Sequence, residues 1–286
     1  MVSDLPATVI VNTAPAERRG HGPSRNQLFA ALVVVALGNA FIDNALLALA
    51  GENLGAALGA GLGVSWGLWL AAGAAVGLAL NASSGKASRV DWIIGAVALV
   101  LCLAPDGHLA ALAASGLGAW MIFSARGDQR LRAAGAVLLA ITVSILWTRI
   151  GLLFVGHPLQ VFDSWLAALA GGTTAVGNTI QFADGDGAAI MLEGCMSLQN
   201  AGMAVTVWLA VTRLFRPQFR ATDILWAAGV FCMVFALNII RLGLIVQSRE
   251  AHRLLHDSWP ASLYPPLILL AALGVAVVTI RREILD

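Results

Sequence analysis

Long apolar stretches recur along the chain and are separated by short polar segments. A helix that crosses the hydrocarbon core of a bilayer, about 30 Å thick, needs roughly 20 such residues. Eight stretches approach that length, and the third and fourth meet at 104–108, a compact turn that suits a helical hairpin. The predicted spans are 27–50, 64–82, 91–105, 109–125, 133–155, 197–213, 223–247 and 263–280. We therefore expect an all-α polytopic membrane protein with about eight transmembrane helices.

Composition supports the same class. Of the 286 residues, 59% are hydrophobic and only 12% are charged, and the mean hydropathy is +0.82. A water-soluble domain of this size cannot hide so much apolar surface behind so few charges. The net charge of +1 gives no indication of a nucleic-acid partner.

The positions of Lys and Arg orient the predicted helices, because these residues gather on the cytoplasmic side of membrane proteins. With the N-terminus inside, every inner connection is basic and both termini are cytoplasmic. Residues 1–26 then form a retained cytoplasmic arm, since they lack the short apolar core of a signal peptide. Four arginines fall outside this pattern, at the outer ends of spans or in an outer loop: Arg149, Arg241, Arg249 and Arg253.

Two connecting segments are more than simple turns. In the outer loop 156–196, the first part, 156–171, mixes apolar residues with Asp163 and Trp165. This pattern predicts a helix at the membrane surface. The glycine-rich run 55–63 is either a membrane-dipping entrance to the second span or a small-residue packing surface.

A β-hairpin is predicted just before the sixth span, on the outer face. Two short apolar segments, 179–182 and 189–192, flank the turn Asp184-Gly185-Asp186-Gly187, whose glycines permit a positive φ. The turn lacks the ligand spacing and the terminal Glu of a calcium-binding EF-hand. The chain thus divides into a cytoplasmic arm 1–26, a five-span half 27–155, an outer loop 156–196 and a three-span part 197–286.

Three side chains that could take part in catalysis lie on the outer face in this predicted topology. Cys195 lies at the mouth of the sixth span, Arg241 at the outer end of the seventh, and His256 in the loop before the eighth. A thiolate needs a nearby base or cation, and a guanidinium can donate hydrogen bonds to an oxyanion. Each residue also has a simpler interpretation: a packing cysteine, a helix-anchoring arginine, and a solvated histidine with which His252 competes.

Three short motifs resemble the exosortase/archaeosortase family of multi-pass membrane cysteine transpeptidases. They are Glu193-Gly194-Cys195, Asn238-Ile239-Ile240-Arg241 and His256-Asp257, in the order and on the face typical of that family. The preceding hairpin is also similar. The chain departs from the family at Met196-Ser197, where Ser-Gly or Ala-Gly is common, and this change bears on the substrate class and on activity.

The resemblance implies a function. Cys195 would be the nucleophile, His256 the acid–base group and Arg241 the oxyanion donor, with site-shaping roles for Glu193, Asn238 and Asp257. The substrates would be exported proteins with a C-terminal hydrophobic sorting helix, cleaved at the outer face of a bacterial or archaeal cytoplasmic membrane and transferred to an acceptor. The expected partners are these exported proteins and membrane lipid, and the resemblance implies no cofactor, metal or nucleic acid. It identifies neither the substrate-binding residues nor the acceptor.

Three alternatives remain at this stage. A solute transporter would use Asp43 and Asn44 of the first span, with Glu52 and Arg149. A catalytically inactive relative would serve as a membrane scaffold, a reading that Met196 favours. A metal site would combine Cys195 with His252 and His256, which have a helix-face ligand spacing.

Overall fold

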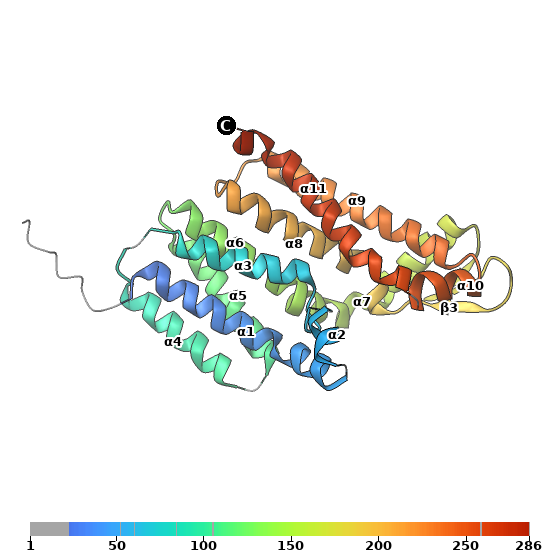
Figure 1. Cartoon of the computed structure of the whole chain (residues 1–286), viewed down its shortest axis with the longest axis horizontal. Coiled ribbons are helices and arrows are strands. Elements are labelled where there is room, and N and C mark those ends of the chain that lie inside the picture. The colour runs from blue at the N-terminus through green and yellow to red at the C-terminus, as the bar shows by residue number, and fades with distance from the viewer. Residues whose placement is uncertain are drawn as a thin grey trace, which may run out of the picture.

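The computed structural model describes residues 23–51, 53–59, 61–83, 85–104, 106–257 and 259–285. Most of the predicted N-terminal arm and Glu52 lie outside these residues. The described chain is a bundle of long helices with a small sheet at one end (Figure 1). The helices are α1 Arg25–Gly51, α2 Leu54–Gly59, α3 Trp66–Leu80, α4 Arg89–Leu103, α5 Gly107–Ser124, α6 Gln129–Thr142, α7 Thr148–Gly171, α8 Ser197–Phe215, α9 Thr222–Ile245, α10 Arg249–His252 and α11 Tyr264–Leu285.

Every predicted span coincides with a helix, which confirms the all-α, membrane-type fold. Within the described residues, five helical segments are long and apolar enough to cross a bilayer: Arg25–Gly51, Gly107–Ser124, Gln129–Gly171, Thr222–Ile245 and Tyr264–Arg281. The others are shorter or more polar, since α3 and α4 have 15 residues each and α8 has 19. A helix of 15 residues is about 22 Å long, less than the hydrocarbon thickness.

One helix is much longer than predicted. A π-helical segment, η1 (Val143–Trp147), joins α6 to α7, so that helix runs unbroken over the 43 residues Gln129–Gly171. The boundary expected after residue 155 therefore falls inside a helix. Residues 156–171 are helical, as predicted, but they continue the fifth apolar segment instead of forming a separate element. Pro158 lies inside this helix.

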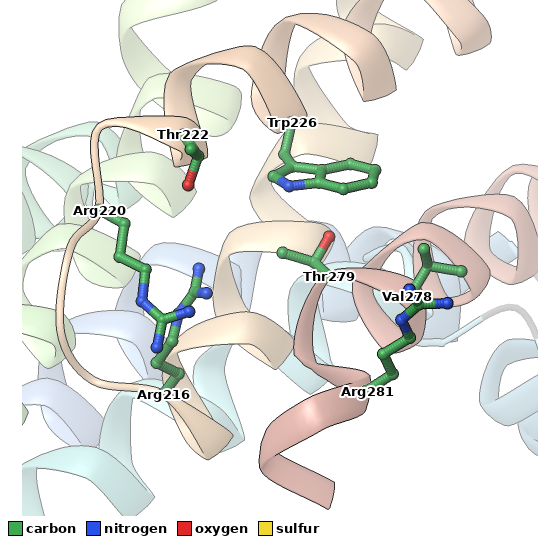
Figure 2. A pocket seen from close by; sticks show the side chains of 7 residues that line it. All are labelled: Arg216, Arg220, Thr222, Trp226, Val278, Thr279 and Arg281. Carbon is green, nitrogen blue, oxygen red and sulfur yellow. The ribbon is translucent and has the colours of Figure 1, made fainter.

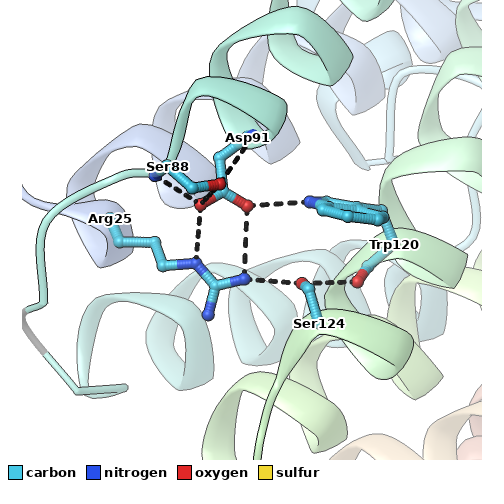
Figure 3. A network of polar contacts seen from close by, with 5 residues as sticks. All are labelled: Arg25, Ser88, Asp91, Trp120 and Ser124. Carbon is cyan, nitrogen blue, oxygen red and sulfur yellow. Dashed lines mark hydrogen bonds and ion pairs between the residues drawn. The ribbon is translucent and has the colours of Figure 1, made fainter.

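A polar network holds the helix ends together at the end of the bundle away from the sheet (Figure 3). The Arg25 guanidinium at the start of α1 donates to both carboxylate oxygens of Asp91 in α4, at 3.0 and 3.2 Å, and to Ser124 of α5 at 2.6 Å. Trp120 Nε1 also donates to Asp91, at 2.8 Å, and Ser88 forms a capping box with it. Asp91 is buried, so its charge is stabilised by these donors.

Small residues let helices approach closely within the bundle. In α5 and α6, a Cβ on Gly118 would lie 2.9 Å from the Gly135 carbonyl oxygen, and one on Gly135 would lie 2.5 Å from that of Gly118. The glycine-rich run 55–63 is mixed in this respect. A Cβ on Gly59, at the end of the short helix α2, would meet nothing within 4 Å, whereas one on Gly63 would lie 2.7 Å from the Asn44 carbonyl oxygen of α1.

The sheet confirms the predicted hairpin and adds a third strand. Strands β2 (Thr179–Gln181) and β3 (Ala188–Ile190) are antiparallel, with Ile180 opposite Ala189, and β1 (Ala175–Val176) pairs with the other edge of β2. Its apolar face packs on α7 and α9 in a cluster of buried residues: Ala167, Ala168, Ile180, Phe182, Met191, Leu242, Ile245 and Val246. Cys195 and Leu255 pack against this cluster, so the sheet supports the segment that carries the cysteine.

Candidate active site

The structure places Cys195 beside His256. Cys195 ends a single 3-10 turn, η2 (Glu193–Cys195), directly before α8, and its side chain is half-buried. Its Sγ lies 3.6 Å from His256 Nε2, a distance at which the imidazole can accept the thiol proton. The two residues are 61 positions apart in the sequence, so tertiary folding creates this pair.

The segment after α9 presents His256 through a second π-helical turn, η3 (Arg253–Asp257), which follows α10. His252, one turn earlier, stacks on His256 with ring centroids 4.9 Å apart and ring planes at 18°. Phe182 of the sheet meets the His252 ring edge-on at 5.9 Å. Of the two histidines, His256 contacts the thiol, and His252 packs on the face of its ring.

Arg241 is held against the same segment. Its guanidinium donates to the Leu255 carbonyl at 3.2 Å, one residue before His256, and lies 4.3 Å from the centre of the Tyr264 ring. A cation over an aromatic face is stabilised by the ring quadrupole. These two contacts fix a guanidinium, whose donors are fork-shaped and always charged, next to the pair formed by Cys195 and His256.

Asn238 joins four parts of the site from a fully buried position. Its amide nitrogen donates to the Cys195 carbonyl and to Ser197 Oγ, both at 2.9 Å. Its amide oxygen accepts from Asn200 Nδ2 at 3.1 Å and from Tyr264 Oη at 2.7 Å. Asn238, for which the sequence predicted a site-shaping role, thus directly contacts the peptide group of Cys195.

A buried carboxylate completes the turn around the cysteine. Asp163 of α7 accepts a hydrogen bond of 2.6 Å from the backbone N–H of Ser197, the first residue of α8. The residue before it, Met196, offers no side-chain cap to this helix. Asp163 therefore caps α8 from another helix, where a negative charge is stabilised by the helix dipole.

The protonation of Cys195 follows from its surroundings. Burial raises the pKa of the Cys195 thiol, and the positive charge of Arg241 opposes that shift. The resting side chain is therefore a neutral thiol at neutral pH, and it ionises when a base takes the proton. His256 is the base in position to do so.

Other predicted residues lie elsewhere or outside the described side chains. Glu193 and Asp257 belong to η2 and η3, but their side chains are outside the described part of the structure. Met196 is almost fully buried, so it packs within the protein interior. Arg149 is not at this site: it lines a separate cavity with Asp43.

Sequence reasoning missed Asp163 and Tyr264 as parts of the site. Asp163 was interpreted as one of the polar residues of a surface helix. A lone acid in an apolar helix is nevertheless a sign of a buried partner or a functional role. Tyr264 is the chain's single tyrosine and stands directly before Pro265 and Pro266. Neither signal names a partner, because both contacts join segments far apart in sequence.

Comparison with known proteins identifies no relative. No family model matches the chain, and neither a curated protein nor a solved structure is significantly similar to it. Within the described residues, no three histidine, cysteine or acidic side chains are grouped as metal ligands. Functional inference therefore depends on the geometry around Cys195.

Proposed function

We propose that this protein is a membrane-embedded cysteine peptidase and transpeptidase of the exosortase/archaeosortase type. The observation that carries the proposal is the 3.6 Å contact between Cys195 Sγ and His256 Nε2. Support comes from Arg241, whose charge acts on the thiol, and from Asn238, which binds the carbonyl of the cysteine itself. The three sequence motifs that suggested the family contribute side chains to this one arrangement.

The first chemical step forms a thioester. His256 Nε2 takes the proton of Cys195 Sγ, and the sulfur attacks the carbonyl carbon of the scissile peptide. The carbonyl oxygen becomes an oxyanion, to which the Arg241 guanidinium donates hydrogen bonds. When this intermediate collapses, the C–N bond breaks and the protonated His256 gives its proton to the leaving amine.

The second step releases the product and restores the thiol. An amine of the acceptor, or water, attacks the thioester carbonyl while His256 takes the attacking group's proton. The C–S bond then breaks, and the sulfur leaves as a thiolate that regains its proton from His256. With an amine acceptor a new amide bond forms, and with water the product is a free carboxylate.

The substrate class follows from where the site lies. The proposed topology has eight crossings, both termini in the cytoplasm, and the sheet and Cys195 on the outer face. Next to Arg241, the α9 side chains Ile240 and Leu244 are more than half exposed, at 56% and 53%. A hydrophobic C-terminal helix of an exported protein can pack there within the bilayer and present its preceding peptide bond to the thiol.

The proposal is tested on the host's exported proteins by C-terminal peptide mass spectrometry. Strains would carry the wild-type chain, Cys195→Ala, or Cys232→Ala, which removes an exposed cysteine of α9. Hydrophobic C-terminal tails should persist only with Cys195→Ala. Identical tails in all three strains, with each protein expressed, would contradict the proposal.

A solute transporter is the second candidate, and one observation favours it. A cavity of about 400 Å³ is lined by Asp43, Asn44 and Arg149, with Gln199 of α8. Charged groups at a membrane cavity are typical of solute pathways. Against this, the Asp43 carboxylate already accepts from the Gly107 N–H at 3.2 Å and so has a structural use. Uptake lost in Asp43→Asn and retained in Cys195→Ala would favour transport over peptidase activity.

A further inference from the structure

A second cavity lies at the other end of α8 from Cys195. It has a volume of about 330 Å³ and forms where the end of α8, the start of α9 and the C-terminal part of α11 meet. Since α8 has 19 residues, about 28 Å of helix separates this cavity from the cysteine. The residues that line it are Arg216, Arg220, Thr222, Trp226, Val278, Thr279 and Arg281 (Figure 2).

Basic side chains predominate among the described residues that line this cavity. Among the described residues that line it, three are arginines and none is acidic. In Figure 2, Arg216 and Arg220 extend into the cavity from one side, and Arg281 lies across from them. Arg216 is ion-paired with Asp223, and the guanidiniums of Arg220 and Arg281 carry the fork-shaped donors that suit phosphate oxygens.

Neighbouring contacts fix the frame of the cavity. The fully buried Arg213 and the nearly buried Arg216 each form an ion pair with Asp223, and the Arg220 N–H donates to that same carboxylate at 2.9 Å. The Arg213 guanidinium also lies 4.1 Å from the centre of the Phe219 ring. These contacts join the end of α8 and the connection that follows it to Asp223 of α9.

The surroundings of the cavity are apolar on the outside of the bundle. Trp226 and Val278 line the cavity and are themselves 38% and 50% exposed. Ile224 and Leu225, at the start of α9, are both 74% exposed. A basic pocket between the ends of apolar helices and next to exposed apolar side chains suits a phospholipid better than a free ion.

We propose that this cavity binds the phosphodiester headgroup of an anionic phospholipid, with the acyl chains along α9 and α11. Arg220 and Arg281 bind the phosphate oxygens from opposite sides, and Trp226 packs beside the glycerol backbone. In the proposed topology this is the cytoplasmic leaflet. The inference rests on membrane embedding alone and is independent of the chemistry at Cys195.

The test is native mass spectrometry of the purified full chain in detergent, titrated with dioleoylphosphatidylglycerol. The variant Arg220→Gln/Arg281→Gln leaves the ion pairs of Asp223 intact. Its control, Arg89→Gln/Arg126→Gln, removes two exposed arginines at the same end of the bundle but outside the cavity. We expect the affinity for the first bound lipid to fall roughly 30-fold in the cavity variant, because each lost charge weakens binding about fivefold. In the control the affinity should fall less than about twofold.

Further arms identify the occupant. Dioleoylphosphatidylcholine should bind far more weakly, and 10-fold molar excess of inorganic phosphate over the lipid, on the order of millimolar, should not displace phosphatidylglycerol. Val278→Trp fills the cavity without removing charge and should also abolish the first binding event, which keeps the test decisive if the double variant does not fold. Equal loss in both arginine pairs, or displacement by phosphate, would overturn the proposal.

Discussion

At the scale of single residues, the site is organised around the peptide group of Cys195. Asn238 binds its carbonyl oxygen, and Asp163 binds the N–H of Ser197, two residues further on. In the proposed function, the thiol is thereby oriented toward His256 before a substrate binds. Such preorganisation lowers the entropy cost of reaching a reactive geometry.

The ionisation of Cys195 should depend on Arg241. In a Cys102→Ala/Cys232→Ala background, alkylation of Cys195 by iodoacetamide should accelerate as the pH rises toward the raised pKa of the thiol. Arg241→Gln removes a charge that lowers this pKa, so the profile should move to higher pH. At pH 8 the alkylation rate of Arg241→Gln should therefore be lower than that of the parent chain.

Arg253→Gln is the control for this experiment, because that arginine is in the same loop but is exposed and pairs with Glu250. It should leave the alkylation profile unchanged. An equal shift in both variants would mean that general surface charge, and not the position of Arg241, tunes the thiol.

Asn238→Ala should destabilise the fold as well as the site. The change leaves a buried serine hydroxyl, the Cys195 carbonyl and the Tyr264 hydroxyl without their partner. We expect the free energy of unfolding to fall by about 2–4 kcal/mol, measured by SDS titration in mixed micelles. Asn81→Ala, at an exposed helix end, should cost less than about 0.5 kcal/mol. Similar losses in the two variants would refute the central role of Asn238.

At the scale of elements, one helix crossing brings the site together. Gly243 of α9 meets α7 closely, since a Cβ on it would lie 2.8 Å from Ala170 Cβ and 3.1 Å from the Ala170 carbonyl carbon. This crossing lies just beyond Arg241 on α9 and just beyond Asp163 on α7. The separation of these two helices therefore sets the spacing between the residues that they contribute.

Gly243→Val should push α7 and α9 apart. The added side chain overlaps backbone that cannot move freely, so we expect a loss of roughly 1–3 kcal/mol in SDS titration and slower alkylation of Cys195. Gly229→Val is the matched control on the same helix, where a Cβ would meet nothing within 4 Å. If the two variants behave alike, the close crossing does not determine the geometry of the site.

The cap that Asp163 provides can be tested in the same way. Asp163→Ala leaves the Ser197 N–H unsatisfied and should cost about 1–2 kcal/mol in the free energy of unfolding. Asp163→Asn keeps an acceptor of similar shape but loses the charge, so it should cost less. Equal costs for the two changes would mean that packing, and not the cap, accounts for the effect.

The helices and the hairpin were predictable because their signals are local. Apolar runs of the right length and a turn with two glycines need no knowledge of distant residues. The continuity of α6 and α7 was not predictable, because Gly156 and Pro158 resemble a helix end and proline removes a backbone donor. Nor could sequence decide between His252 and His256, since only the fold shows which ring faces the thiol.

At the scale of the whole molecule, the two ends of the bundle differ in chemistry. One end carries the thiol, the imidazole and the sheet, and the other carries the Arg25 network and the arginine-lined cavity (Figure 1). The arginine-rich end is the one that the proposed topology places on the cytoplasmic side. The order of the motifs was readable from sequence, but their meeting at one end required the helices to be packed.

The proposed sidedness can be tested with single cysteines in a background that lacks Cys102, Cys195 and Cys232. Gly185→Cys, in the hairpin turn, should react in intact cells with a membrane-impermeant maleimide. Gln218→Cys, in the connection between α8 and α9, should react only after the cells are opened. Labelling of both positions in intact cells would contradict the topology that places Cys195 outside.

In the proposed function, the unbroken helix of Gln129–Gly171 also limits which substrates can be cut. Its 43 residues extend over about 65 Å, roughly twice the hydrocarbon thickness, and its last turns carry the cluster on which Cys195 rests. In the proposed topology, the length of this helix therefore sets the distance between the thiol and the membrane midplane. A scissile bond reaches that height only when the apolar tail behind it has a matching length. In the mass spectra, released tails should therefore differ widely in sequence while varying little in length.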